Sequence, residues 1–386
     1  MPLRIAAASV LLAGMSAPAP DRPGSEAATL DAATAALCGR QIAVLGEAEH
    51  GDARTEAFKI ALIERLVSRC GYTAVVFEAS FYEFVQLDRE QRAGRPLTPG
   101  QIATAVGGLW KWNREFQPLL PYLASQANSG RIRLGGFDFQ QGGREQDFSN
   151  TGVVAELTAE LPPERRQTCR ALFRDLVFKG SSPERRQAVA PCLTEMGALP
   201  PSADRTVRRE RRELLANLAA FTAADPSDST GYTAQRDRAM FANFERWKAR
   251  WPAGSKIIVW TATAHAARAP HGHKGFQGVQ PFGAYLAGRY GQAAFALGFA
   301  AQGGTTRGRP QPRVIAPPAP GTLEAWAGPI APGGALFLDR AALARAGERP
   351  AGLFNHGPVT ATWSRLLDGV VVFDAERAPA DIRKGG

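Results

Sequence analysis

Short runs of apolar and β-branched residues recur along the chain, and stretches with helical spacing separate them. The first two runs flank a segment in which Phe58, Leu62 and Leu66 repeat along one face of a helix. Strand, helix and strand in this order are typical of a parallel sheet with right-handed crossovers. The sequence therefore predicts an α/β fold with a mostly parallel β-sheet and flanking helices. The predicted strands are 42–45, 74–77, 132–137, 256–260, 293–299, 335–338 and 370–373.

The chain of 386 residues is long enough for two or three structural units, or for one core with a large insertion. Between 151 and 231 the strand pattern disappears, and prolines interrupt a series of helical segments. We interpret this stretch as a helical insertion, or cap, between a first part of the α/β core at 36–150 and a second part at 232–380. The segment 301–320 is rich in Gly and Pro, and we expect it to form a long loop.

The N-terminal residues 1–22 combine one positive charge, a short apolar run and small residues, as secretory signal peptides do. We expect an exported protein, periplasmic or secreted, with no membrane segment after cleavage. Four cysteines in an exported chain allow two disulfides. The preferred pairs are Cys38–Cys70, which would join the start of a strand to the end of the returning helix, and Cys169–Cys192, between consecutive helices. The alternative is four buried free thiols.

The composition, 45% hydrophobic and 21% charged, excludes intrinsic disorder for the chain as a whole. The formal net charge of +10 raises the question of a nucleic-acid partner. However, the basic runs alternate with Glu, as on solvated helix faces, and they lack the interleaved aromatic residues of a single-strand binding platform. We therefore expect no nucleic-acid partner, and the oligomeric state is left open.

Ionisable residues follow four consecutive predicted strands, at the point where each strand ends. Glu47 and His50 follow the first, Glu78 the second, Asp138 the third, and His265 the strand after the helical insertion. In open parallel sheets, ligands bind beyond the carboxyl ends of the strands. The sequence therefore predicts an active site at this edge of the sheet.

These strand ends also carry a family pattern. The chain resembles the erythromycin esterase family over about 40–150 and 232–300. The motifs that carry the resemblance are Gly46-Glu47-x-x-His50-Gly51, Glu78-Ala79, Gly136-Phe137-Asp138-x-Gln140, Arg236-Asp237-x-x-Met240-x-x-Asn243, Trp260-x-x-x-Ala264-His265-x-x-Arg268 and, more weakly, Trp110-x-Trp112-Asn113-Arg114-Glu115, with a family-like close at Phe373-Asp374.

The resemblance implies metal-independent hydrolysis of a small-molecule ester or macrolide lactone, with no cofactor. It implies that His50 is the general base that activates water, that Glu47 and Glu78 orient it or hold its charge, and that His265 assists at the carbonyl or leaving oxygen. A histidine near its ordinary pKa of ~6.5 can accept a proton at neutral pH, which agrees with this assignment. The residues expected to bind substrate are Arg54, Trp110, Trp112, Asp138, Arg236, Asn243 and Arg268.

The sequence departs from the family pattern at two positions. Ala262 stands where members commonly carry a second histidine, three residues before His265. Lys59 stands in place of an arginine early in the first helix, where Arg54 is a possible substitute. Lysine cannot replace the planar fork of arginine. These departures leave the fold and the site location in place but not the macrolide specificity.

Several of these residues also have purely structural interpretations. Glu47 and Glu78 are alternatively buried carboxylates paired with Arg54 or Arg268, and His265 is alternatively a hydrogen-bonded core histidine.

Other aromatic and polar residues have two interpretations as well. Trp110 and Trp112 either line an apolar pocket or pack the cap. Asp138 either contacts a ligand or caps the following helix. His356, in Asn355-His356-Gly357, is expected in a turn.

Two other functions are compatible with the same residues. A metal-dependent hydrolase would use a mixed nitrogen and oxygen site, and an exported metal- or haem-binding protein would use the same fold without catalysis. The chain has no Gly-x-Ser-x-Gly motif for a nucleophilic serine. His271 and His273, in a Pro/Gly-rich loop, are either metal ligands or exposed loop residues. The mixed site would draw on Glu47, Glu49, His50, Glu78 and His265.

Overall fold

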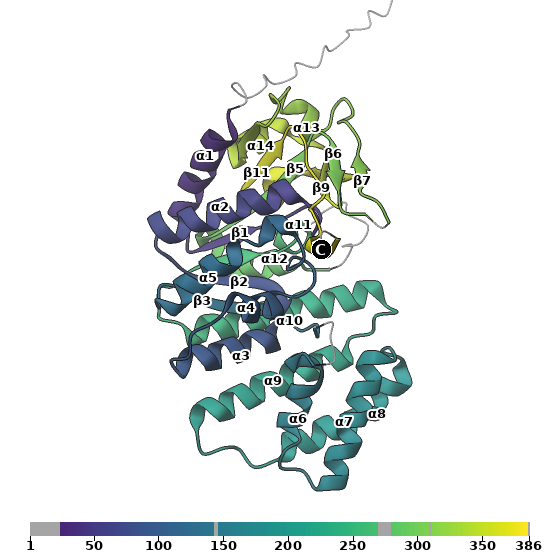
Figure 1. Ribbon diagram of the computed structural model, residues 1–386. Coiled ribbons are helices and arrows are strands. Elements are labelled where there is room, and N and C mark those ends of the chain that lie inside the picture. The colour runs from purple at the N-terminus through teal and green to yellow at the C-terminus, as the bar shows by residue number, and fades with distance from the viewer. Residues whose placement is uncertain (1–23, 143–145, 269–278, 309, 385–386) are drawn as a thin grey trace, which may run out of the picture.

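A seven-stranded sheet forms the centre of the computed structural model, which describes residues 24–142, 146–268, 279–308 and 310–384 (Figure 1). The strand order is β3-β2-β4-β1-β5-β11-β8, and only β8 is antiparallel to its neighbour. This confirms the predicted α/β class. The strands are β1 (Ile42–Leu45), β2 (Tyr72–Ser80), β3 (Arg133–Asp138), β4 (Lys256–Trp260), β5 (Ala294–Ala301), β8 (Ala335–Asp339) and β11 (Gly369–Phe373).

Helices flank this sheet. The α-helices are α1 (Glu26–Cys38), α2 (Ala53–Arg69), α3 (Phe81–Arg92), α4 (Pro99–Val106), α5 (Leu119–Asn128), α6 (Val153–Leu157), α7 (Pro163–Phe178), α8 (Pro183–Ala198), α9 (Arg205–Ala223), α10 (Ser229–Arg250), α11 (Thr263–Ala266), α12 (Phe282–Tyr290), α13 (Leu323–Trp326), α14 (Arg340–Ala346) and α15 (Trp363–Leu366). Short 3-10 or π turns are η1 (Arg114–Phe116), η2 (Phe148–Gly152), η4 (Gly291–Ala293) and η5 (Ile382–Lys384).

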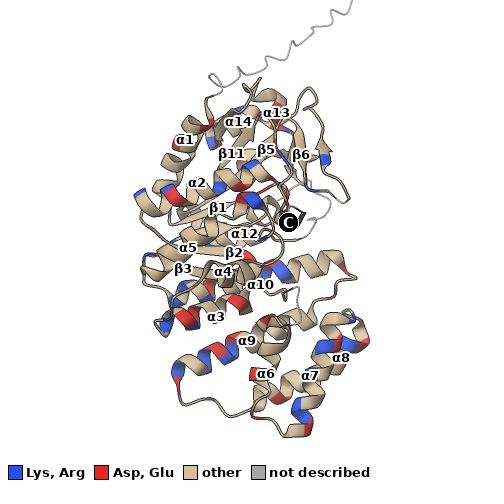
Figure 2. Ribbon diagram, viewed as in Figure 1, with Lys and Arg blue, Asp and Glu red and all other residues tan. Residues whose placement is uncertain are grey.

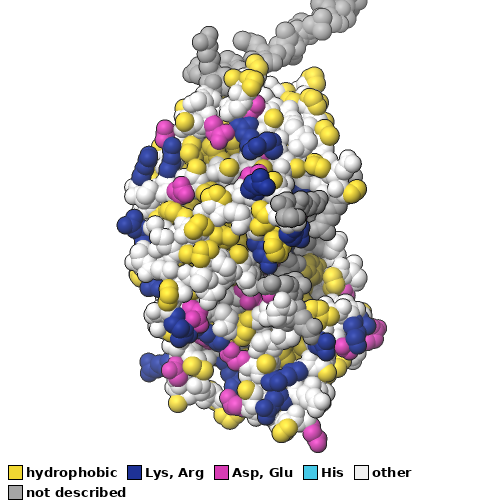
Figure 3. All heavy atoms as spheres, in the orientation of Figure 1, with side chains coloured by type: hydrophobic (Ala, Val, Ile, Leu, Met, Phe, Trp, Pro, Cys, Tyr) yellow, Lys and Arg dark blue, Asp and Glu magenta, His cyan; other side chains and the backbone are white. Residues whose placement is uncertain are grey.

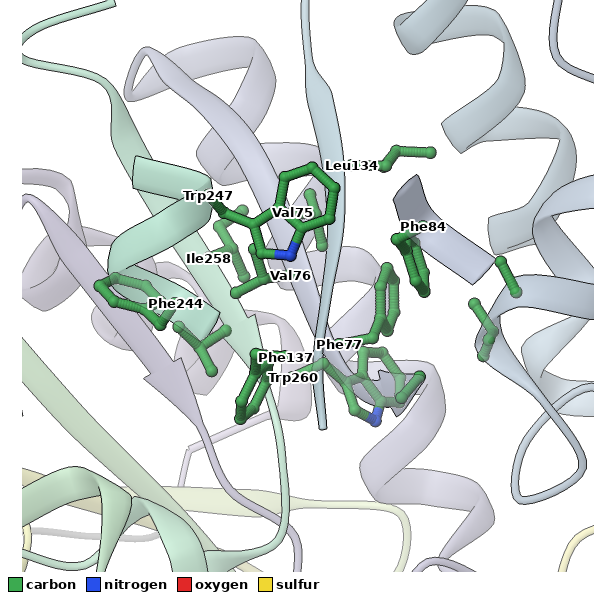
Figure 4. Close-up of a cluster of buried hydrophobic side chains, with 14 of the residues drawn as sticks. Val75, Val76, Phe77, Phe84, Leu134, Phe137, Phe244, Trp247, Ile258 and Trp260 are labelled. Atoms are coloured by element: carbon green, nitrogen blue, oxygen red, sulfur yellow. The ribbon is translucent and has the colours of Figure 1, made fainter. Parts of the chain in front are cut away.

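Apolar side chains of β2, β3 and β4 meet those of α3 and α10 in the main core (Figure 4). Trp247 of α10 is fully buried, and its indole Nε1 donates a hydrogen bond to the carbonyl oxygen of Gly136, at 2.7 Å. A Cβ at Gly135 would approach the Trp247 ring to 3.1 Å, and one at Gly136 would meet Phe84 at 2.4 Å. These two glycines therefore let α3 and α10 pack closely on β3, the strand that ends at Asp138.

Helices α6 to α9 lie together at one end of the molecule, beyond α3 and α10 (Figure 1). They occupy most of the stretch interpreted as a helical insertion, and the domain boundaries stay a prediction. A disulfide between Cys169 and Cys192 joins α7 to α8, and a second joins Cys38 to Cys70 at the ends of α1 and α2. Both predicted pairs are confirmed, and the alternative of four free thiols is wrong.

Charged residues of both signs alternate along α7, α8 and α9 (Figure 2), and the visible face of these helices shows the same mixture of charged side chains (Figure 3). Several arginines there pair with carboxylates, as Arg165 does with Glu195 and Arg211 with Glu160. Within the described residues, no helix is long and apolar enough to cross a membrane.

Two hairpins outside the main sheet did not follow from the sequence. The first consists of β6 (Gly304–Thr306) and β7 (Arg313–Ile315), so the long loop expected at 301–320 is in fact interrupted by two three-residue strands. Three-residue strands are too short to give a readable alternation of apolar and polar residues. The second hairpin pairs β9 (Glu348–Phe354) with β10 (Gly357–Thr362). Both hairpins lie beside the carboxyl end of β1.

Candidate active site

The loop between β1 and α2, residues 46–52, lies against the end of β4. A Cβ at Gly46 would lie 2.7 Å from Thr263 Oγ1 and 3.0 Å from its Cα, so only glycine fits without displacement. The amide of Thr263 donates to the carbonyl oxygen of Glu47, at 2.8 Å. These contacts bring the strand ends of β1 and β4 together, as the parallel sheet predicts.

Within this loop, Glu47 is the acceptor for three different side chains. Its Oε1 lies 2.6 Å from His50 Nδ1 and accepts from Trp110 Nε1, at 3.0 Å. Its Oε2 accepts from Lys59 Nζ, at 2.7 Å. Lys59 is completely buried, and its ammonium lies 3.9 Å from the centre of the Trp260 ring. The ammonium of Lys59 therefore neutralises Glu47, the carboxylate that holds His50.

The charges around His50 favour an imidazolium. Burial alone would raise the pKa of Glu47, but attraction to Lys59 and the hydrogen bond from His50 hold that pKa below its usual value. Burial alone would lower the pKa of His50, but the hydrogen bond to Glu47 and the charge of Glu78 raise it above its ordinary value. Consequently His50 is a stronger base than a free histidine.

Glu78, at the end of β2, is the centre of a second group. Its Oε1 accepts from Arg236 Nη2, at 2.8 Å. Its Oε2 accepts from Thr261 Oγ1 at 2.7 Å and from the amide of Ala262 at 2.8 Å. Arg236, from α10, also binds Asp138, with Nη2 2.6 Å from Oδ2. Burial would raise the pKa of Glu78, but His265, Arg236 and His50 hold it well below its usual value.

His265 faces both Glu78 and a second carboxylate. Its Nδ1 lies 2.8 Å from Asp237 Oδ1, and its Nε2 lies 3.3 Å from Glu78 Oε1 and 3.0 Å from Arg236 Nη1. Burial and Arg236 lower the pKa of His265, but Asp237 and Glu78 outweigh them and raise it to about 10. The raised pKa favours the protonated form of His265.

Both histidines point their Nε2 atoms at the same carboxylate oxygen. His50 Nε2 lies 3.8 Å from Glu78 Oε1, which is too far for a direct hydrogen bond but within reach of one through water. The arrangement places a raised-pKa base and a cationic donor on either side of one ionised carboxylate. This combination makes the cluster a candidate catalytic site.

A pocket of about 400 Å³ opens beside this cluster. Glu78 and Asp138 contribute to its wall from the strand ends, and Trp112 and Lys111 contribute from the segment after α4. This volume is in the range of small-molecule sites. The remaining lining includes Ala79, Glu83, Leu109, Gln140 and Asp147.

The two tryptophans differ in their surroundings, and Asp138 does not have its predicted role as a helix cap. Trp112 lines the pocket, whereas Trp110 is buried and hydrogen bonded to Glu47. Asp138 accepts from the amide of Gln140 rather than from a helix N-terminus, so its interpretation as a helix cap is wrong.

Three predicted substrate-binding residues lie away from the cluster. Arg54 binds Glu26 and Asp374, and Arg268 pairs with Asp368. Asn243 donates to the carbonyl oxygen of Phe137, at 3.1 Å, inside the core. Neither arginine pairs with Glu47 or Glu78 in the described part of the chain, so that alternative names the wrong cations.

The sequence interpretation missed two members of the cluster. Asp237 follows Arg236 directly on α10, and this adjacency is the signal by which it could have been found. Lys59 was noted as a departure but not as a site residue. His356 does lie in a turn, as expected. His271 and His273 lie outside the described residues.

Comparison with solved structures finds the same fold in three proteins. A Bacillus cereus protein has a TM-score of 0.71 and 18% identity over 93% of this chain and 94% of that chain. A succinoglycan biosynthesis protein has a TM-score of 0.69 and 16% identity over 92% of both chains. A His-to-Asn mutant of the erythromycin esterase EreC, in its open conformation, has a TM-score of 0.68 and 17% identity over 91% and 95%. No curated protein sequence matches the chain significantly.

The sequence itself matches the erythromycin esterase family over residues 67–375. Because this span is more than half of the 386 residues, the chain belongs to the erythromycin esterase family, and the predicted resemblance is confirmed. Membership supports a hydrolase. The match begins beyond the β1–α2 loop, so the roles of Glu47 and His50 depend on the geometry described above.

Proposed function

We propose that this protein hydrolyses an ester or lactone without a metal ion, and that His50 is the general base. The observation that carries the proposal is the position of His50. Its Nδ1 is held by Glu47 at 2.6 Å, and its Nε2 faces Glu78 at 3.8 Å at the carboxyl edge of the sheet. The pocket of about 400 Å³ begins at the same carboxylate.

In the proposed reaction, His50 takes a proton from a water molecule as that water attacks the carbonyl carbon. Glu47 fixes the tautomer, because it accepts from Nδ1 and leaves the Nε2 lone pair for the water proton. The imidazolium that forms is then stabilised by Glu47 and Glu78. Glu47 does not need to move, since Lys59 and Trp110 hold it from the other sides.

The charge that develops on the carbonyl oxygen requires a donor, and His265 supplies it. Its raised pKa favours the protonated form, whose Nε2–H can donate to an oxyanion or to the leaving oxygen. Asp237 holds its Nδ1 at 2.8 Å, and Arg236 contributes a second positive charge beside its Nε2. Arg236 is in turn oriented by Asp138.

The substrate class is a small-molecule ester or lactone with apolar parts that pack against Trp112. We do not assign a macrolide. Ala262 leaves only a methyl group where the family commonly has a second histidine. Its amide also donates to Glu78, at 2.8 Å, so the backbone there already takes part in holding the site.

We also propose that the mature protein acts outside the cytoplasm after removal of a signal peptide at 1–22. The two disulfides are compatible with an extracytoplasmic location, because such bonds persist in oxidising compartments.

The decisive experiment incubates the purified mature protein with a 14-membered macrolide and with a panel of p-nitrophenyl esters. Each incubation is run with and without chelator and is followed by mass spectrometry or absorbance. The wild type should add one water to at least one compound, with chelator present, and His50→Ala should lose this activity. His50→Gln is a matched control for the fold, because it keeps a polar side chain of similar size.

Undiminished hydrolysis by His50→Ala would refute the assigned base. Loss of hydrolysis in chelator, restored by a divalent metal, would instead favour the metal-dependent hydrolase. A haem Soret band in the purified protein, without hydrolysis, would favour the binding protein.

A further inference from the structure

The β1–α2 loop, residues 46–52, is held from outside the sheet by the β6–β7 hairpin. Thr306, the last residue of β6, donates through Oγ1 to Asp52 Oδ1 at 2.6 Å and to the carbonyl oxygen of Gly51 at 3.2 Å. The next amide, of Arg307, donates to the same carbonyl oxygen of Gly51, at 3.1 Å. The end of β6 therefore fixes the last residues of the loop.

The turn between β9 and β10 holds the same loop from a second direction. Asn355 and His356 are its two central residues, with φ of 51° and 54°. The amide of Asn355 donates to the carbonyl oxygen of Ala48, at 2.8 Å. The His356 side chain is only 4% exposed, and its Nε2 lies 3.0 Å from each carboxylate oxygen of Asp52.

His356 occupies a position that favours glycine. Type I′ hairpin turns need positive φ at both central residues. Glycine satisfies this at the lowest energetic cost, and Asn, Asp and His are the side chains most often found there. A histidine that accepts the strained backbone and buries its ring against a carboxylate is best explained by the contact that the ring makes.

Asp52 also contacts the residue that precedes the proposed base. Its Oδ2 accepts from the amide of Glu49, at 3.0 Å, and Glu49 directly precedes His50. Asp52 is 1% exposed, so its orientation depends on these protein donors. The chain of contacts runs from His356 through Asp52 to the backbone of Glu49. None of the three lines the pocket of about 400 Å³ beside Glu78, whereas His356 lines a second pocket of about 190 Å³.

We propose that His356 is a positioning residue that, through Asp52 and the amide of Glu49, fixes the β1–α2 loop so that His50 stays on Glu47. The proposal rests on the proposed function for its catalytic consequence, but the geometric consequence for His50 is independent of the substrate. His356 does not contact the reacting atoms, so its effect is on the geometry of the base.

Other charged groups face these residues and set the size of the effect. Glu376 lies beside Asp52, and burial and repulsion from Asp52 raise the pKa of Glu376 to about 7. Glu49 faces Arg313, at 3.7 Å, across the loop. Without the imidazole of His356, Asp52 loses one of its hydrogen-bond donors while Glu376 still repels it. We therefore expect the carboxylate of Asp52 to move.

The first test compares His356→Ala, His356→Gln and Trp363→Phe. Glutamine keeps an amide donor near the position of Nε2. Alanine and glutamine both lack the preference of histidine for positive φ, so the comparison of these two variants isolates the donor. Trp363→Phe is the control for a loss within the same hairpin. It removes the hydrogen bond to the carbonyl oxygen of Arg349, at 2.9 Å, and part of a buried ring that packs on Phe354, and within the described residues Trp363 has no hydrogen bond to the β1–α2 loop.

With the ester that the wild type hydrolyses, His356→Ala should lower kcat about tenfold and leave KM within about twofold, because the misplacement affects the base and not the pocket. His356→Gln should recover most of kcat, and Trp363→Phe should match the wild type. Thr306→Val, which removes the donor on the other hairpin, should lower kcat in the same direction. An unchanged kcat in both His356→Ala and Thr306→Val would overturn the proposal.

A double-mutant cycle separates positioning from general destabilisation. In the Asp52→Asn background, His356→Ala should lower kcat by less than twofold further, because its route to His50 is already interrupted. Full additivity of the two effects on kcat would overturn the route through Asp52.

A second readout needs no substrate. The chain has five histidines, and the imidazole signal of His50 is assigned by its loss in His50→Ala. NMR titration should show the pKa of His50 above the ordinary ~6.5 in the wild type and in Trp363→Phe, and closer to ~6.5 in His356→Ala. If the pKa of His50 in His356→Ala equals that in the wild type, the proposal is overturned whether or not the wild type hydrolyses any ester. If that pKa differs between the two proteins but the wild type hydrolyses no ester, only the proposed function is refuted.

Discussion

Replacing Lys59 by methionine tests how the site holds its central carboxylate. Lys59 and Glu47 are 0% and 1% exposed, and 2.7 Å separates Nζ from Oε2. Methionine has a similar length and keeps the apolar stem, so the main change is the loss of the ammonium. The variant leaves a buried carboxylate with His50 and Trp110 as its remaining donors.

Removing one partner of a buried ion pair typically costs about 3–5 kcal/mol, because the other charge stays buried without compensation. We expect a loss near the lower end, about 3 kcal/mol in the free energy of unfolding, since two donors to Glu47 remain. The double variant Glu47→Gln with Lys59→Met removes both charges and should recover most of this loss. The four proteins form a cycle that isolates the pair.

The assay is urea unfolding at neutral pH, followed by circular dichroism with both disulfides intact. The pKa of Glu47 is lowered in the folded protein, so its ionised form contributes stability that is present at neutral pH and is lost as the pH falls through that pKa. The deficit of Lys59→Met should therefore be largest at neutral pH and should shrink on acidification. A loss below about 1 kcal/mol, or a double variant no more stable than Lys59→Met, would refute the reasoning.

Three further outcomes follow from the site and the disulfides. His50 accepts a proton only when it is neutral, and its pKa is raised. Therefore kcat/KM for a non-ionising ester should rise with pH with an apparent pKa above ~6.5. An apparent pKa below ~6.5 would contradict the contact with Glu47. His265→Asn should lower kcat about 100-fold with little change in KM, measured by steady-state kinetics, because it removes a cationic donor. Replacing Cys169 and Cys192 by serine should lower the free energy of unfolding by about 3 kcal/mol, measured by urea unfolding.

The sequence was sufficient to predict the main sheet and the edge of that sheet at which the ionisable residues meet. Parallel strands are buried on both faces, so they appear as short continuous apolar runs, and each of the seven predicted runs is a strand of the main sheet. The residues that follow such strands lie at one edge as a matter of geometry. This is why Glu47, Glu78 and His265 were placed together without a structure.

Ion pairs between residues that lie far apart in sequence could not be predicted in the same way. Arg54 follows the β1–α2 loop directly and appeared available to the site, yet its guanidinium turns to Asp374, which is 320 residues away in sequence. Lys59 lies six residues into α2 and reaches Glu47 instead. A shift of one residue, about 100° around the helix axis, changes which side of α2 a cation faces, and single-sequence patterns do not resolve helix boundaries to that precision.

The two short hairpins show why the support of a site is harder to predict than its location. Thr306 and His356 lie more than 250 residues from Asp52 in sequence, and each contributes one side chain to the same carboxylate. Neither strand of β6–β7 is long enough to show a period, and the β9–β10 turn lacks the Asn-Gly dipeptide that usually marks such a hairpin. The sequence predicted only that His356 lies in a turn. Its consequence for the loop that carries His50 requires the three-dimensional position of Asp52, because the interaction depends on a carboxylate whose other partners come from two further parts of the chain.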